Sequence, residues 1–132
     1  RFCTSKFTIQ SFKITYLIRN LILWNKKKFE HPLELNTGIK KFKILQKSLA
    51  KDGLYGCVEI SKGLLTIDPD QCPEDYKGTL LHEICHIGFE LFGLGDDDEM
   101  PQVGNEYLTT VTGNMIQLFS SLNKELFKFI LG

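Results

Sequence analysis

Residues 79–86 of the chain read TLLHEICH, and this stretch decides the predicted fold because it places two histidines one helical turn apart. On an α-helix, His82 and His86 lie on one face with their Cβ atoms about 5–6 Å apart. That spacing lets both imidazoles bind one tetrahedral Zn²⁺ at about 2.0–2.1 Å. Glu83 then lies beside the metal, where its carboxylate can take a proton from zinc-bound water. The H-E-x-x-H pattern therefore predicts a zinc site with a general base; the alternative is a helix whose histidines are only hydrogen-bonded in the core.

The residues around this motif are typical of a helix. Pro73 is followed by Glu74 and Asp75, which suits a helix start because proline fits the first turn and acids favour the positive end of the helix dipole. Mostly apolar residues follow to about Leu91, and Gly93 is a stop signal. We therefore predict that the motif lies on a helix.

Glu106 is the residue that we expect to complete the metal site. It begins a second helical pattern, in which apolar residues recur at helical spacing: Leu108, Val111, Met115, Leu118 and Phe119. A ligand on a helix is held more rigidly than one on a loop. The acidic run Asp96-Asp97-Asp98-Glu99 also offers carboxylates, but it is typical of a solvated loop between two helices.

The remaining pattern predicts a short β-sheet and further helices, hence an α+β fold. A strand is expected over residues 39–45, and a β-hairpin over residues 55–61 and 64–68 with Lys62-Gly63 in its turn. Residues 29–38 are interpreted as a linker, because Pro32 interrupts regular structure. Residues 9–28 fit an amphipathic helix, although a strand is also compatible, and residues 123–131 fit a terminal helix packed on the core.

Composition limits the class of protein. A chain of 132 residues with 42% hydrophobic and 24% charged residues suits one globular domain with a sizeable core. We divide it into a basic and apolar extension, residues 1–37, expected to pack on the core, and a main domain, residues 38–132. No apolar run is long enough to span a bilayer. The four cysteines form no C-x-x-C pair and are expected to be reduced packing residues.

The net charge of zero conceals a strong asymmetry. Residues 1–51 hold 12 Lys/Arg and 2 Asp/Glu, whereas residues 52–132 hold 4 and 14. The basic half could face nucleic acid or an anionic surface, or the two halves could neutralise each other in the fold. We favour neutralisation and do not expect a nucleic-acid partner, because apart from Lys26-Lys27-Lys28 the basic residues are scattered and no nucleic-acid-binding motif accompanies them.

The order of strand, hairpin, H-E-x-x-H helix and acid-bearing helix resembles a minimal zincin core, and the downstream Glu makes it gluzincin-like. From about Gly38 to Gly132 the chain resembles small phage and prophage zinc metallopeptidases, loosely akin to the ImmA/IrrE peptidase domain. The residues that carry this resemblance are Tyr55-Gly56, the Leu65-Thr66-Ile67-Asp68 strand, Thr79 to His86, Asn105-Glu106 and Asn123-Lys124-Glu125-Leu126. The resemblance implies a short sheet packed on two helices, bound zinc and a hydrolase-like site. We also expect a cytoplasmic location, in the host-cell cytoplasm if the chain is phage-encoded.

The expected function is that of a zinc metallopeptidase acting on a peptide or protein substrate. Zn²⁺ would be held by His82, His86 and Glu106, with Glu83 as the general base. The hairpin, particularly residues 64–68, could bind extended substrate by strand addition. Tyr76 and Tyr107 are candidates to stabilise the oxyanion, and spacing selects neither; the third histidine, His31, is expected to be a surface loop residue. Two alternatives stay open: a zinc-stabilised phage-type protein that binds a partner without hydrolysis, and, ranked last, a nucleic-acid-binding module.

Overall fold

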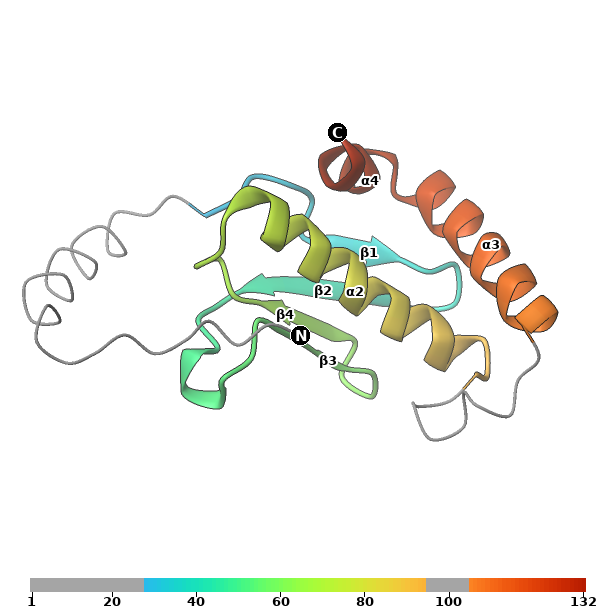
Figure 1. Cartoon of the computed structure of the whole chain (residues 1–132), viewed down its shortest axis with the longest axis horizontal. Coiled ribbons are helices and arrows are strands. Elements are labelled where there is room, and N and C mark those ends of the chain that lie inside the picture. Colours follow the sequence, from blue (N-terminus) through green and yellow to red (C-terminus); the bar gives the residue numbers. More distant parts are fainter. Residues whose placement is uncertain (1–27, 95–104) are drawn as a thin grey trace, which may run out of the picture.

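The described part of the chain is an α+β structure in which three α-helices and a four-stranded sheet pack together (Figure 1). The computed structural model describes residues 28–94 and 105–132. Its elements, in chain order, are β1 (Glu34–Asn36), β2 (Lys41–Gln46), the short 3₁₀ helix η1 (Ala50–Asp52), β3 (Gly56–Glu59), β4 (Leu64–Ile67), α2 (Pro73–Leu91), α3 (Asn105–Leu122) and α4 (Lys124–Leu131). No helix in these two ranges is long and apolar enough to cross a membrane.

The sheet is mixed, with the strand order β1-β2-β4-β3. β1 pairs antiparallel with β2, β2 pairs parallel with β4, and β4 pairs antiparallel with β3. The hairpin register places Gly56 opposite Ile67 and Glu59 opposite Leu64. Two of the strands, β1 and β3, therefore form the edges of the sheet.

One face of the sheet carries the core, and none of the helices in residues 28–94 and 105–132 covers the other face. In β2, Phe42 and Ile44 are buried whereas Lys41, Lys43 and Leu45 are exposed, as expected for a strand covered on one side only. α2 crosses the covered face, and α3 and α4 pack beside it (Figure 1). The core joins all these elements through the buried apolar residues Leu35, Phe42, Ile44, Leu65, Ile67, Tyr76, Leu80, Ile84, Ile87, Met115, Phe119, Leu126, Phe127 and Ile130.

Most of the predicted elements are confirmed within the described ranges. The strand expected over residues 39–45 is present as β2. The structure also contains the hairpin, the motif helix, the acid-bearing helix and the terminal helix. The hairpin turn is built on Gly63, whose φ of +62° suits glycine because it has no Cβ to clash. The predictions for residues 9–27 and for the acidic run 96–99 lie outside the described residues.

The predicted linker over residues 29–38 is wrong, because part of it forms the edge strand β1. Pro32 precedes the strand and does not interrupt it, and Leu35 is fully buried against the core. The side chain of Asn123, between α3 and α4, holds β1 in place. Asn123 Oδ1 accepts from Asn36 N at 2.7 Å, and its Nδ2 donates to Asn36 O at 2.7 Å and to Phe119 O at 2.8 Å.

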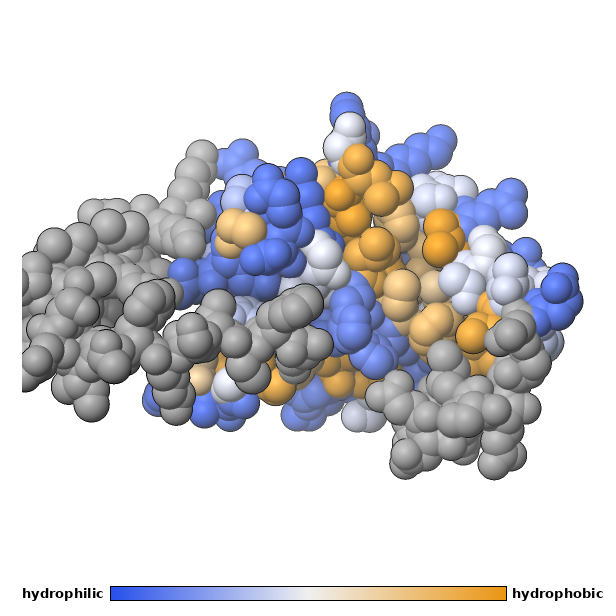
Figure 2. Space-filling model, viewed as in Figure 1, coloured by the Kyte–Doolittle hydropathy of each residue, from blue (hydrophilic) through white to orange (hydrophobic). Residues whose placement is uncertain are grey.

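Apolar side chains also reach the surface on the helical side of the molecule. Figure 2 shows them over α4 and in the region between α2 and α3. On α3, Ile116, Leu118 and Leu122 are partly exposed, and Tyr107 is 56% exposed. The buried contact of α3 with α2 is made by Met115, which lies directly over Gly88.

Candidate metal centre

The two motif histidines lie together on the exposed face of α2. His82 Nε2 and His86 Nε2 are hydrogen-bonded to each other at 3.0 Å, and the rings are nearly perpendicular, at 80°. Two nitrogens bound to one tetrahedral Zn²⁺ at about 2.0–2.1 Å are about 3.3 Å apart. The pair is therefore within a few tenths of an ångström of the spacing that a shared zinc requires.

Packing of the opposite face of α2 sets the direction of these histidines. Leu80, Ile84 and Ile87 are almost completely buried in the core. Residues three and four apart share one helix face, so these three residues turn one face of α2 to the core. His82 and His86 lie on the other face and are exposed. The apolar periodicity of the helix thus presents both imidazoles to solvent, where a metal ion and a substrate can reach them.

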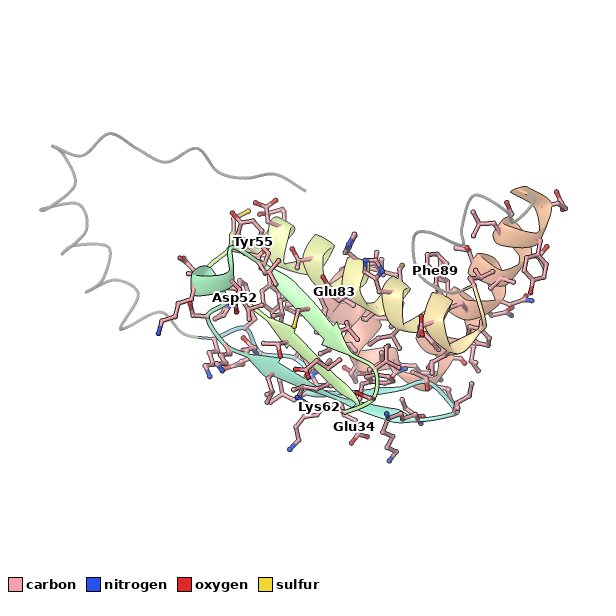
Figure 3. The ribbon with its side chains drawn as sticks, turned by 90° about the horizontal axis from the view of Figure 1, so that it is seen from below. Glu34, Asp52, Tyr55, Lys62, Glu83 and Phe89 are labelled. Atoms are coloured by element: carbon pink, nitrogen blue, oxygen red, sulfur yellow. The ribbon has the colours of Figure 1, made fainter. Side chains whose placement is uncertain are left out.

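Glu83 extends from α2 toward the sheet, against β3 (Figure 3). Its side chain is only 5% exposed. A Cβ placed on Gly56 would lie 2.8 Å from Glu83 Cγ and 2.9 Å from its Oε1, closer than real contacts allow. Gly56 therefore makes the room that Glu83 occupies, a role that no sequence pattern indicates.

Glu106 is not brought to the histidine pair in the structure. It is exposed in the first turn of α3, and the described residues contain no group of three His, Cys, Asp or Glu side chains arranged to hold a metal. Asp96 to Glu99, the other acids considered, lie outside the described residues. The structure thus places His82 and His86 at chelating distance, with Glu83 next to them in the chain, and leaves the third ligand unassigned.

Within the hairpin, the strand at the sheet edge is β3, and the prediction that residues 64–68 offer an edge for strand addition is wrong. β4 is an inner strand, hydrogen-bonded to β2 on one side and to β3 on the other. β3 belongs to the hairpin as predicted, but it is the strand that forms the sheet edge and it contacts α2 at Glu83. An extended chain laid along this edge would pass next to the motif helix.

His31 is not a simple surface loop residue, because it joins the segment before β1 to α2. Its Nδ1 lies 2.7 Å from Pro32 O, and a carbonyl oxygen only accepts, so Nδ1 carries the proton. Its Nε2 then accepts from Tyr76 Oη at 2.7 Å. Burial lowers the pKa of His31, which favours this neutral ring.

Tyr76 is consequently a poor candidate for stabilising an oxyanion. It is completely buried, its hydroxyl is bonded to His31, and its ring stacks on Phe29 at 4.0 Å between centroids. Burial also raises the pKa of the Tyr76 hydroxyl. Tyr107 is exposed on α3.

Three cysteines fall in the described ranges, and all three are free thiols. Burial, followed by the nearby carboxylates of Glu59 and Glu83, raises the pKa of Cys57. Burial alone raises the pKa of Cys85, inside the motif. The elevated pKa keeps both of these side chains as protonated thiols at neutral pH.

Comparison of the chain with models of known protein families, with curated proteins and with solved structures found no match. A sheet with helices on one face hosts many unrelated activities, so the fold does not define one. The function has to be inferred from the site itself, namely from the histidine pair, Glu83 and the strand beside them.

Proposed function

We propose that the protein is a zinc-dependent metallopeptidase in which His82 and His86 bind the metal and Glu83 is the general base. The observation that supports this most strongly is the 3.0 Å separation of the two Nε2 atoms on an exposed helix face. A purely structural role for the pair would not need an acid between them. Glu83 lies against Gly56 of the edge strand β3 and directly follows His82 in the chain, which supports a role for its carboxylate beside the proposed metal and the proposed substrate.

Zinc would supply a bound water with a pKa near 7 and a positive charge to polarise the peptide carbonyl. Glu83 would accept the proton of that water and pass it to the leaving amine. Its near-complete burial favours this role, because a carboxylate shielded from bulk water accepts and returns a proton with little solvent rearrangement. The β3 edge would hold the substrate extended beside the helix through main-chain hydrogen bonds.

Glu106 remains our proposal for the third ligand. Its ligation would require the first turn of α3 to approach α2, and the acids of residues 96–99 are the competing donors. Glu106→Ala should weaken zinc binding at least tenfold in a chelator competition titration, whereas Asp98→Ala and Glu99→Ala should not. The reverse ranking would assign the ligand to the acidic run.

The proposed activity is tested with Glu83→Gln, which keeps the size of the side chain but cannot accept the proton. This variant should retain zinc and lose hydrolysis of a peptide library by at least a hundredfold. Glu90→Gln is the matched control, since Glu90 lies on the same helix but is exposed. Equal cleavage by wild type and Glu83→Gln would rule out Glu83 as the base.

A second candidate is a zinc-stabilised protein that acts by binding a partner without hydrolysis. The uncharged surface of α3 favours it, because Glu106 is the only charged residue in that helix and several apolar side chains are exposed. Protein interfaces are depleted of charge at their centres. In this case Glu83→Gln and wild type would be equally inactive on every peptide while both bind zinc.

A further inference from the structure

Helix α3 presents an uncharged surface to solvent. Residues 106–122 of this helix are exposed around most of its circumference, and Glu106 is its only charged residue. Met115 and Phe119 bury one side of the helix in the core. A helix on the surface of a soluble protein ordinarily carries charged residues on the side away from the core. The lack of charge over this length is instead typical of the centre of a protein–protein interface.

Apolar side chains form one stripe along the flank of α3. Tyr107, Leu118 and Leu122 are exposed, and Val111 is half-buried. Successive members are four, seven and four residues apart, and these spacings keep them on one side of a helix. At about 1.5 Å per residue the stripe is about 22 Å long. Glu106 lies about 100° around the helix from Tyr107 and is therefore off this line, which we call the α3 stripe.

The α3 stripe continues onto the turn between β1 and β2. A Cβ built on Gly38 would lie 3.5 Å from Leu122 Cδ1 and 4.0 Å from Leu118 Cδ2, so this turn lies against the C-terminal end of the stripe. Ile39, the next residue of the turn, is 67% exposed. Single exposed apolar residues are ordinary, but apolar side chains that continue from one element to another mark an interaction site.

The spacing of the α3 stripe is symmetric about its midpoint, which lies next to Asn114. Tyr107 and Leu122 are equally far from this midpoint along the helix, and so are Val111 and Leu118. If two copies of α3 lie antiparallel about a two-fold axis at the midpoint, each apolar residue of one copy meets an apolar residue of the other. Asn114 is exposed at the centre, where its amide meets that of the partner's Asn114.

The partner that this symmetry fits is a second copy of the chain. In a two-fold interface residue i contacts residue j and j contacts i, so a stripe that pairs with itself has to be symmetric, whereas an unrelated partner requires no symmetry. The lack of charge fits the same partner, because a charged face would meet its own charge in a second copy. A polar asparagine in the contact line of paired helices also fixes their register.

We propose that two copies of the protein form a dimer in which their α3 helices pack antiparallel along the α3 stripe. Tyr107 then lies against the partner's Leu122, and Val111 lies against the partner's Leu118. Ile39 lies at each end of the pair, where it extends the contact from the helix to the sheet. This dimer is independent of the metal centre, because the histidine pair lies on α2.

The test is sedimentation equilibrium of the full chain over a concentration series, which gives the dimer dissociation constant. Wild type should approach twice the chain mass of 15.1 kDa as the concentration rises. Leu118→Glu buries a charge from each copy in the interface, so the dissociation constant should rise at least about a hundredfold. Ile116→Glu is the matched control and should leave the constant unchanged, because Ile116 is similarly exposed but lies about 160° around α3 from Leu118.

The antiparallel register is tested by disulfide cross-linking under mild oxidation. Asn114→Cys places two thiols beside the two-fold axis, within the reach of a disulfide, and should give a covalent dimer. Gln117→Cys is the matched control, because Gln117 is exposed on the same helix but lies about 100° around it from the contact line. This control should cross-link no more than wild type, whose own cysteines supply the background.

A second variant keeps the outcome decisive. If Leu118→Glu loses helix content by circular dichroism, Tyr107→Glu replaces it with the same expected effect, because Tyr107 is the more exposed residue. The proposal is overturned if wild type sediments as a monomer at every concentration, if Ile116→Glu weakens the dimer as much as the stripe variants do, or if Gln117→Cys cross-links as well as Asn114→Cys. A stripe covered by residues 1–27 or by an unrelated protein would give the first of these results.

Discussion

Replacing Gly88 with alanine tests how α3 is held against the motif helix. A Cβ at this position would lie 1.8 Å from Met115 Sδ and 2.6 Å from Met115 Cγ. Because Cγ is close to the backbone and Met115 is only 1% exposed, the whole side chain must change rotamer or α3 must move. Gly78→Ala on the same helix is the matched control, since a Cβ there meets nothing within 4 Å.

Both variants replace a helical glycine by alanine, but only Gly88→Ala introduces a clash with Met115. Each should gain about 1 kcal/mol from replacing glycine by alanine within a helix. Only Gly88→Ala pays for overpacking, at about 1–3 kcal/mol. Gly78→Ala should therefore be more stable than wild type by about 1 kcal/mol, and Gly88→Ala less stable than Gly78→Ala by about 1–3 kcal/mol.

The assay is urea unfolding followed by circular dichroism, with the free energy of unfolding extrapolated to water. Combining Gly88→Ala with Met115→Ala should remove the clash, so the coupling between the two substitutions should be favourable by about 1 kcal/mol or more. Equal free energies of unfolding for the two single variants would show that α3 does not pack on Gly88 as described.

Three further outcomes follow from contacts in the structure. Asn123→Ala should lower the free energy of unfolding by about 2–3 kcal/mol, because one buried and two partly buried hydrogen bonds to backbone groups are lost. A loss below about 0.5 kcal/mol by urea unfolding would contradict the connection to β1. Burial lowers the pKa of His31 from its ordinary value of 6.5. The contribution of this neutral histidine to the stability of the fold is therefore complete above about pH 6.5 and declines as the pH falls through the folded-state pKa. Wild type should therefore lose more thermal stability between pH 7.5 and 5.5 than His31→Gln, which has no proton to take up beside Tyr76; equal losses would show that this ring does not titrate with folding. Gly56→Ala should reduce hydrolysis by displacing Glu83 while zinc content, measured by mass spectrometry, stays at the wild-type level; unchanged hydrolysis would mean that the contact does not position the base.

The motif helix and the hairpin were predictable because their signals are local. Pro73 and the two acids after it mark the start of α2, and the apolar periodicity marks its length. The Lys62-Gly63 turn marks the hairpin. Each of these signals lies within a short stretch of sequence. β1 could not be found in this way, because a strand of three residues shows no alternation and is stabilised by pairing with β2 and by Asn123, which is 87 residues from Asn36. Local rules therefore predict that Pro32 interrupts regular structure, whereas it only precedes the strand.

In the candidate site, too, the local features could be predicted from the sequence and the long-range ones could not. The spacing of His82 and His86 is a property of one helix, so the sequence alone places their nitrogens together. The choice of edge strand depends on the order of the strands, and a parallel pairing of β2 with β4 moves β4 inside the sheet. Likewise the attachment of Phe29 to the end of β2 depends on two side-chain hydrogen bonds from Gln46 across 17 residues, which no local pattern indicates.

The most direct test of the central claim is the zinc content of the full chain by native mass spectrometry. Wild type should carry about one zinc ion per chain, because two histidines at chelating distance with an acid form an open site. His82→Ala should lose that zinc while keeping its fold by circular dichroism, since His82 is exposed and outside the core. Full retention of zinc by His82→Ala, or no zinc in wild type after exposure to the metal, would contradict the assignment of a metal centre to this helix.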